Sequence, residues 1–367
     1  MATGMDTLYR RAYQGVNYRL RNVFGGRLAD YTRPTSIIFL LTELCSAKCL
    51  HCDIWKNRGR EDSPTADQWK QLVTDLRDWL GPVGITISGG EALMKPFTVD
   101  VVAHAHKVGI PLEILTHGYW ADQRKIEALA MARPNRVTLS LDGIGETHNI
   151  VRGKEKFWDF TTMTLATLKR MRQEHDLPYT IRLKNVIMAH NLCDTVKMAH
   201  YAAENGFEVF YQPIEQNYNT PEDSEWWLHT ENWPKDTALA VANVKELIVL
   251  KGQGLPIRNS YAQLEAMIPY FEDVAAHRLT VQAHAGHERM ASCSALTMLQ
   301  VQANGDITVC NGAPPVGNIK NTPIREIWAQ RPKLWRQGCC MERRLTKDEL
   351  HAIELAPSLT AAKSWEQ

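Results

Sequence analysis

The sequence predicts an α/β fold built on a partial (β/α)6 TIM-like barrel. From Pro34 to about Pro213, short apolar runs alternate with amphipathic stretches long enough to be helices, which is typical of βαβ units around a parallel sheet. The length of 367 residues also allows a large core and about two domains. The predicted strands are Ile37–Thr42, Val83–Ser88, Leu112–Thr116, Arg136–Leu141, Thr180–Met188 and Phe207–Gln212. The predicted helices between them are Ala66–Trp79, Val99–Lys107, Arg124–Met131, Phe160–Glu174 and Thr195–Asn205.

The first stretch, Tyr9 to Arg33, is basic and carries apolar residues at roughly helical spacing. A basic amphipathic helix can lie on an anionic membrane surface. The alternative is a solvated helix that packs under the main domain.

A polar stretch rich in tryptophan, Glu215–Asp236, follows the sixth predicted strand. Long irregular insertions are often lids or binding loops, but tryptophans also anchor loops onto a core, and both interpretations stay open. A helix over Thr237–Leu250 is expected to close the barrel.

Composition and charge narrow the class of protein. The net charge of +1 argues against broad electrostatic binding of nucleic acid. No segment reaches about 18 uninterrupted apolar residues, so no transmembrane segment is expected, and the N-terminus lacks the apolar core of a signal peptide. Eight cysteines without an export signal favour metal binding or catalysis over disulfides. We therefore expect a cytoplasmic protein.

The most informative run is Cys45-Ser-Ala-Lys-Cys49-Leu-His-Cys52, just after the first predicted strand. Closed ferredoxin-type clusters use four cysteines, so three thiolates can hold a cubane cluster and leave its fourth iron open. An open metal position is where a substrate or cofactor binds. The alternatives are a zinc knuckle or a redox pair with a spare thiol.

Two further groups of residues end predicted strands. Ser88-Gly89-Gly90-Glu91 ends the second strand; its glycines allow close approach to the backbone, and Glu91 can pair with an ammonium group. Ser140 and Asp142 lie two residues apart at the end of the fourth strand and so share one face. Ligands of parallel α/β sheets bind at the carboxyl ends of strands.

The order of these motifs resembles the radical S-adenosylmethionine (SAM) superfamily. The resemblance rests on the C-x3-C-x2-C run, on Gly89-Gly90-Glu91, and on Leu139-Ser-Leu-Asp-Gly143 followed by Arg152-Gly153. It implies a [4Fe-4S] cluster on Cys45, Cys49 and Cys52, whose open iron chelates SAM. The implied SAM contacts are His51, Ser88, Gly89, Gly90, Glu91, Thr116, Ser140, Asp142, Arg152 and Asn191.

Within this resemblance, His51 would lie against adenine, Glu91 would meet the SAM amino group, Ser140 the ribose, and Arg152 the SAM carboxylate. Asn191 is a further candidate for the adenosine. His117 stands where the family has Asn in a Thr-Asn-Gly turn, so no role follows for it. No residue is assigned as catalytic acid, base or hydrogen donor.

Four further cysteines lie in a second, C-terminal group. Leu296–Ala303 and Asp306–Cys310 flank Asn304-Gly305, which predicts a β-hairpin. With Cys293 before it, the hairpin resembles the opening of SPASM and twitch auxiliary-cluster domains, and Ile324–Trp328 resembles their linker helix. The resemblance implies one auxiliary [4Fe-4S] cluster on Cys293, Cys310, Cys339 and Cys340.

This group departs from the full SPASM pattern, because after Cys310 the chain offers only the adjacent pair Cys339-Cys340. Whether both ligate is open; if one does, the auxiliary cluster also keeps an open iron. Zinc in a structural site suits four cysteines equally well. His284 and His287 lie upstream and are expected to be ordinary loop residues. Cys193 is expected to be a buried small hydrophobe, with a redox-active hydrogen donor as the alternative.

The expected domains are an N-terminal segment (1–33), the radical SAM barrel (34–255) with a lid-like insertion (215–235), the auxiliary cluster domain (256–345) and a C-terminal tail (346–367).

The resemblance implies reductive cleavage of SAM to a 5′-deoxyadenosyl radical that abstracts a hydrogen from substrate. Oxidation, epimerisation and rearrangement of the substrate stay open, and an oxidoreductase-type enzyme is preferred. A flavodoxin- or ferredoxin-like reductant would supply the electron. Only about 33 residues precede the first predicted strand, too few for a leader-binding domain, so a small-molecule substrate is preferred to a ribosomal peptide. An iron–sulfur electron carrier or a zinc-stabilised binding protein is the alternative of another class.

Overall fold

The computed structural model describes residues 4–22, 28–57, 62–218, 220–221, 223–277, 294–310 and 314–336. The chain divides into two compact units. Unit 1 comprises Met1–Glu43, Gly59–Glu113 and Leu279–Ala361, and unit 2 comprises Leu44–Arg58, Ile114–Arg278 and Ala362–Gln367. Strand β3 (Leu112–Thr116) crosses the division.

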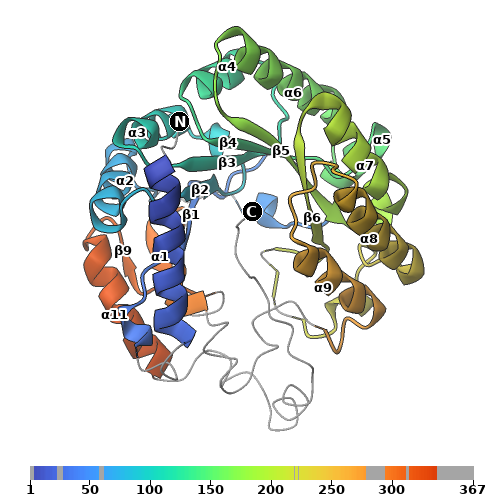
Figure 1. Cartoon of the computed structure of the whole chain (residues 1–367). Helices are drawn as coiled ribbons and strands as arrows, with labels where there is room; N and C mark the ends of the chain where they lie inside the picture. The colour runs from blue at the N-terminus through green and yellow to red at the C-terminus, as the bar shows by residue number, and fades with distance from the viewer. Residues whose placement is uncertain are drawn as a thin grey trace. The chain divides into compact units, whose positions relative to one another are not determined.

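Unit 1 is a mixed sheet with helices (Figure 1). Its strands follow the order β2-β1-β7-β8-β9; β1 pairs in parallel with β2 and β7, whereas β8 runs antiparallel to β7 and β9. Its strands are β1 (Ser36–Leu40), β2 (Ile85–Ser88), β7 (Met298–Val301), β8 (Asp306–Thr308) and β9 (Gly317–Asn318). Its helices are α1 (Gly4–Asn22), η2 (Ala29–Tyr31), α2 (Ala66–Leu80), η4 (Ala92–Met94), α3 (Thr98–Val108), η8 (Ser294–Leu296) and α11 (Ile324–Arg336).

Unit 2 holds three parallel strands in the order β6-β5-β4. These are β4 (Arg136–Ser140), β5 (Thr180–Ile187) and β6 (Glu208–Pro213). Its α-helices are α4 (Arg124–Met131), α5 (Glu146–Arg152), α6 (Phe157–Glu174), α7 (Leu192–Asn205), α8 (Thr237–Gly252) and α9 (Tyr261–Glu272). Short 3-10 helices are η3 (Ile54–Lys56), η5 (Ala189–Asn191) and η6 (Trp226–Leu228).

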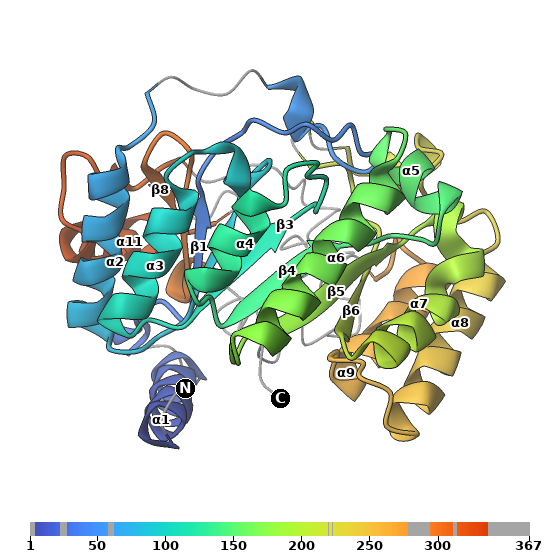
Figure 2. The same cartoon turned by 90° about the horizontal axis from the view of Figure 1, so that it is seen from above.

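One face of the β4–β6 strands is covered by helices, as both views of α6 and α7 show (Figures 1 and 2). Tyr211 of β6 faces this side, because its hydroxyl donates to the carbonyl of Thr195 in α7 (3.0 Å). Leu139, Leu183 and Val209 are fully buried. Alternate residues of a strand point to opposite faces, so Ser140 and Lys184, which are register partners, lie on the face away from these helices.

The fold class is the predicted one, a mixed α/β fold whose parallel strands are wound in chain order. All six predicted strands and the five helices between them occur within a few residues of their expected bounds. Helices α5 and α9 were not predicted. The signal for α9 was present, because Ser260 and Gln263 form a capping box at its start; α5 has only seven residues, too few for periodicity to show.

Helix α1 packs against unit 1 through one face. Tyr9 donates to the carbonyl of Leu80 (2.8 Å) and Tyr13 donates to that of Pro34 (2.7 Å). Another stripe is exposed: Met5 at 78%, Leu8 at 68% and Val16 at 57%. None of the helices that the structure describes combines the length and apolarity needed to cross a membrane.

In the tryptophan-rich insertion, Trp233 has the anchoring role. Its ring lies 5.5 Å from that of Tyr270 and 5.6 Å from that of Phe271, both in α9, while Trp226 packs edge-on against it. This part of the insertion is therefore fixed to a helix of unit 2.

Candidate functional site

The three clustered cysteines lie together in unit 2. Cys49 is buried with Ala47 and Phe157, and Cys45 and Cys52 pack against the same apolar cluster. Burial raises the pKa of Cys49 and that of Cys52. A bound metal centre supplies the positive charge that favours the thiolate, so this donor set suits an iron–sulfur cluster.

The arrangement differs from a site for one ion. Among the described residues, no three His, Cys, Asp or Glu side chains are grouped so that they could hold a single metal ion. A cubane cluster is held by cysteine thiolates on separate irons, so its ligands do not need to meet at one point.

The cysteine loop is fixed to the end of α5 by its backbone. Lys48 donates to the carbonyl of Arg152 (3.1 Å), and Leu50 donates to that of Val151 (3.0 Å). Gly153 follows with a φ of +66°, and a Cβ placed there would overlap the carbonyl oxygen of Lys48. The Arg-Gly pair noted in the sequence is therefore a close contact with the cysteine loop.

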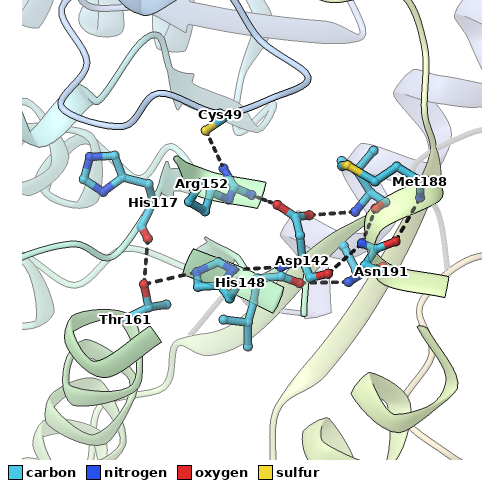
Figure 3. Close-up of polar contacts among 11 residues, drawn as sticks. Cys49, His117, Asp142, His148, Arg152, Thr161, Met188 and Asn191 are labelled. Carbon is cyan, nitrogen blue, oxygen red and sulfur yellow. Dashed lines mark hydrogen bonds and ion pairs between the residues drawn. The ribbon is translucent and has the colours of Figure 1, made fainter. Parts of the chain in front are cut away.

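Arg152 joins the cysteine loop to the end of β4 (Figure 3). Its guanidinium pairs with the buried carboxylate of Asp142 and donates to Cys49 Sγ (3.5 Å). Although burial opposes both charges, each partner stabilises the other: the pKa of Arg152 is raised and that of Asp142 is lowered. Arg152 Nε is buried and has no hydrogen-bond partner among the described residues. A buried donor beside Cys49 fits an anionic group such as the carboxylate of SAM.

Asp142 and Asn191 fasten the ends of β4 and β5 together. Asp142 Oδ1 accepts from the backbone of Val186 (2.9 Å), and Asn191 Nδ2 donates to the carbonyls of Asp142 (2.6 Å) and Val186 (2.7 Å). Asn191 Oδ1 also accepts from Met188 (2.9 Å). The hydrogen bonds that the structure describes for Asp142 and Asn191 are thus made to other protein groups. These bonds shape the edge of the site.

A hydrogen-bond chain runs from the end of β4 to the cysteine loop. His148 Nδ1 accepts from Asp142 N (3.2 Å), which leaves Nε2 as the donor toward Thr161 Oγ1 (3.5 Å). Thr161 donates to the carbonyl of His117 (3.1 Å). His117 Nδ1 accepts from Tyr119 N (3.0 Å), so its Nε2 donates to Ser46 Oγ (3.0 Å).

Both histidines are neutral, because burial lowers the pKa of each to about 3. No role for His117 follows from the sequence. The structure shows that it holds Ser46, the residue after Cys45.

His51 lies next to this group. Burial lowers its pKa to about 4, and its Nδ1 has no hydrogen-bond partner among the described residues. A neutral imidazole with an unused ring nitrogen suits contact with an adenine ring.

The strand ends of unit 2 hold two more predicted residues. Thr116 Oγ1, at the end of β3, accepts from Gly118 N (3.2 Å) and Trp120 Nε1 (3.3 Å), so it shapes the turn. Ser140, the last residue of β4, lies in register with Lys184.

Unit 1 contains the glycine motif at the end of β2. Gly89 has a φ of +135°, and a Cβ there would lie 2.5 Å from the carbonyl oxygen of Thr42. Gly90 donates to the same carbonyl (2.7 Å). Glu91 is buried and caps η4, since its Oε1 accepts from Leu93 N (3.1 Å). The turn from Ser88 to Glu91 thus requires glycine at position 89.

Sequence reasoning missed Glu215, which lies just past the carboxyl end of β6. Burial raises the pKa of its carboxyl, and the charge of Lys184 opposes that shift. Its side chain makes no hydrogen bond or ion pair within the described part of the chain. Strand ends are where ligands meet an α/β barrel, so its position after the sixth predicted strand was the available signal.

In the C-terminal group, the β7–β8 hairpin formed as predicted, and Gly305 takes a φ of +88° in its turn. Cys310 follows it and is buried. Cys293, Cys339, Cys340, His284 and His287 lie outside the described residues. The expectation that Cys193 is buried was wrong: it is exposed at the second position of α7, because Leu192 and Thr195 supply the buried face there.

The site thus has three thiols on one loop, a buried arginine beside the central thiol and polar residues at strand ends, as expected from the sequence for a cluster-dependent SAM site. Two family models match the chain: the radical SAM superfamily over residues 39–212 and SPASM, an iron–sulfur cluster-binding domain, over residues 293–349. The chain therefore contains a radical SAM domain and a C-terminal SPASM domain, and these two domains imply SAM and [4Fe-4S] clusters as its cofactors.

Characterised relatives include both small-molecule and peptide enzymes. The chain is 26% identical to the AdoMet-dependent heme synthase of Methanosarcina barkeri, over 82% of this chain and 84% of that protein. It is 25% identical to the PqqA peptide cyclase of Streptomyces rochei, over 80% and 75%. The crystal structure of Streptococcus suis SuiB bound to S-adenosylmethionine is similar with a TM-score of 0.61 at 16% identity, covering 81% of this chain and 66% of that one. This likeness supports the partial barrel.

Proposed function

We propose that the protein reductively cleaves SAM and abstracts a hydrogen atom from a small-molecule substrate, with an oxidoreductase-type outcome. When bound, the cluster and SAM supply the electron transfer and the 5′-deoxyadenosyl radical that this chemistry needs. The observation that carries the proposal is the buried Cys49–Arg152–Asp142 contact. It brings to Cys49 a guanidinium whose Nε–H has no hydrogen-bond partner in the part of the chain that the structure describes.

The chain's own residues have distinct tasks in this proposal. Cys45, Cys49 and Cys52 hold the cluster, and Arg152 donates to the carboxylate of SAM. His51 contacts adenine, while Gly89, Gly90 and Glu91 with Ser88 receive the amino group. Thr116, Ser140, Asp142 and Asn191 shape the edge where the adenosine lies. Auxiliary-cluster ligation falls to Cys293, Cys310 and one or both of Cys339 and Cys340.

Substrate contact is assigned to Glu215 and Lys184. Lys184 lies on the strand face away from the helices, in register with Ser140. Its charge acts on both His51 and Glu215. Glu215 and Lys184 are therefore assigned to the part of the site where the adenosine is expected. A substrate that donates a hydrogen atom has to bind there. A carboxyl with a raised pKa at a strand end is a candidate for proton transfer or substrate binding.

The similarity to the heme synthase, which spans more than four-fifths of both proteins, favours a small molecule. The PqqA peptide cyclase matches almost as much of the chain, so maturation of a ribosomal peptide is the second candidate. Family membership disfavours a plain electron carrier or a zinc-stabilised binding protein, because neither uses SAM.

Two partners complete the proposal. A flavodoxin- or ferredoxin-like reductant would supply the electron. Cysteine ligands stay reduced in a reducing compartment, which supports a cytoplasmic location. The exposed apolar stripe of α1, together with exposed Arg11 and Arg19, supports contact of this helix with an anionic membrane surface.

The test is formation of 5′-deoxyadenosine by anaerobically reconstituted protein with SAM and a strong reductant. The native protein should form it, and a Cys45→Ala/Cys49→Ala/Cys52→Ala variant should not. A porphyrin precursor of heme and a PqqA-type peptide are then compared as substrates by the rate enhancement that each gives. Faster formation of 5′-deoxyadenosine with the peptide alone would favour the second candidate. A cluster whose spectrum does not change when SAM is added would contradict the proposal.

A further inference from the structure

The carbonyl of Leu50, between Cys49 and His51, is held by two asparagines from the tryptophan-rich insertion. Asn217 Nδ2 donates to it at 3.0 Å and Asn232 Nδ2 at 2.8 Å. A carbonyl oxygen has two lone pairs, so these two amides fill its capacity. The segment far along the chain is thereby fixed to the centre of the cysteine loop.

Asn232 connects the loop to the adenosine side of the site as well. Its backbone carbonyl accepts from Ala189 N (2.9 Å), in the η5 turn that ends with Asn191. Its side-chain amide also contacts Asn217 Oδ1 (3.2 Å), and only 6% of the residue is exposed. One buried asparagine therefore bonds to the cysteine loop, to the second asparagine and to the turn after β5.

The insertion grips the loop at a second point. The carbonyl of Tyr218 accepts from Asp53 N (2.9 Å), and Tyr218 forms a parallel bridge with Cys52. The insertion thus contacts the loop on both sides of His51. On its other edge the loop is bonded to α5 through Lys48 and Leu50.

We propose that Asn217 and Asn232 are positioning residues that hold the cysteine loop in the geometry that binds SAM. Because Leu50 lies between a cluster ligand and the adenine contact, a change in the path of the insertion moves both. The same insertion begins at Glu215, so substrate contact there is transmitted through Asn217 to the cofactor loop. This inference rests on the proposed function.

The experiment measures SAM affinity by titrating the reduced cluster and following its EPR signal. Asn217→Ala and Asn232→Ala are compared singly and together with the native protein. One neutral hydrogen bond contributes about 1 kcal/mol, so each single variant should bind SAM about fivefold more weakly. The double variant should show a larger loss and an altered EPR signal in the SAM-bound state. Iron and sulfide content should stay at the native level.

Asn243→Ala is the matched control. Asn243 is also buried, and it also donates to a backbone carbonyl, that of Leu192 (2.7 Å), but it lies in α8. Its loss should lower the unfolding temperature without changing SAM affinity. Should Asn232→Ala fail to load iron, the half-buried Asn217 supplies the test alone.

Native affinity and an unchanged EPR signal in both Asn217→Ala and the double variant would overturn this inference only. Equal weakening by Asn243→Ala would do the same, since the effect would then be general destabilisation. A native cluster that does not respond to SAM would overturn the proposed function together with the inference.

Discussion

Gly153 shows how one residue limits the cysteine loop. Gly153→Ala places a Cβ against the Lys48 carbonyl at a φ of +66°. A left-handed conformation alone costs an L-residue roughly 1–2 kcal/mol, and the overlap adds to that. We expect the variant to lose at least about 2 kcal/mol of unfolding free energy and the iron of the cysteine-loop cluster, measured by denaturation and metal analysis.

Gly206→Ala separates the cost of the left-handed conformation from the effect of the overlap with the Lys48 carbonyl. Gly206 ends α7 with a φ of +70°, and a Cβ there would meet nothing within 4 Å. It should lose only the conformational cost and keep its iron. Equal iron loss in both variants would show that the contact with Lys48 is unimportant.

His148 predicts how stability depends on pH. Folded His148 stays neutral down to a pKa of about 3, against an ordinary value of 6.5, so below pH 6.5 the unfolded chain binds the extra proton. Its contribution is complete above pH 6.5 and is lost as the pH falls toward 3, at up to about 1.4 kcal/mol per pH unit. Urea denaturation at several pH values should show a shallower acid loss for His148→Gln. Identical slopes would mean that His148 is protonated in the fold.

Helix α1 exposes an apolar stripe of Met5, Leu8 and Val16, and packing within the described part of the chain does not account for it. Leu8→Glu should abolish binding to vesicles that contain anionic lipid, because it places a negative charge in the apolar stripe. Leu228→Glu is the control, since Leu8 is 68% exposed and Leu228, in η6, is 66% exposed. Sedimentation with anionic and neutral vesicles measures the effect. Binding that Leu8→Glu leaves intact, or a dimer formed through α1, would contradict membrane contact.

Elements of the barrel could be predicted from sequence because their signals are local. Short apolar runs that alternate with amphipathic stretches predicted β1 to β6. The Asn304-Gly305 pair predicted the turn between β7 and β8. Helix α5 was not predicted because its seven residues, which end at Arg152, are too few to show helical periodicity. Cys193 was wrongly expected to be buried. Whether a side chain of α7 is buried depends on which face of the helix packs against β5 and β6.

The site residues show the same limit. The spacing of Cys45, Cys49 and Cys52 alone was enough to predict a cluster-binding loop. The buried pairing of Arg152 with Asp142, the neutral chain through His148 and His117, and the asparagines on Leu50 depend on contacts between residues up to 182 positions apart. No local pattern encodes such contacts, so they required the structure.

For the whole molecule, the residues that the sequence predicts as functional are divided between the two units. Unit 2 holds the cysteine loop, Arg152 and Glu215, whereas unit 1 holds the Gly89 turn and Cys310. The SPASM match over residues 293–349 implies a second cluster, so the first cluster is tested most simply in a variant that lacks ligands of the second.

The central claim is that Cys45, Cys49 and Cys52 hold a cluster that binds SAM. Its most direct test is the EPR spectrum of the reduced Cys293→Ala/Cys310→Ala variant, recorded with and without SAM, because this variant removes auxiliary ligands and leaves the loop intact. We expect about four irons per chain and a signal that shifts when SAM is added. A fully loaded, reduced cluster with the same spectrum in both samples would contradict it.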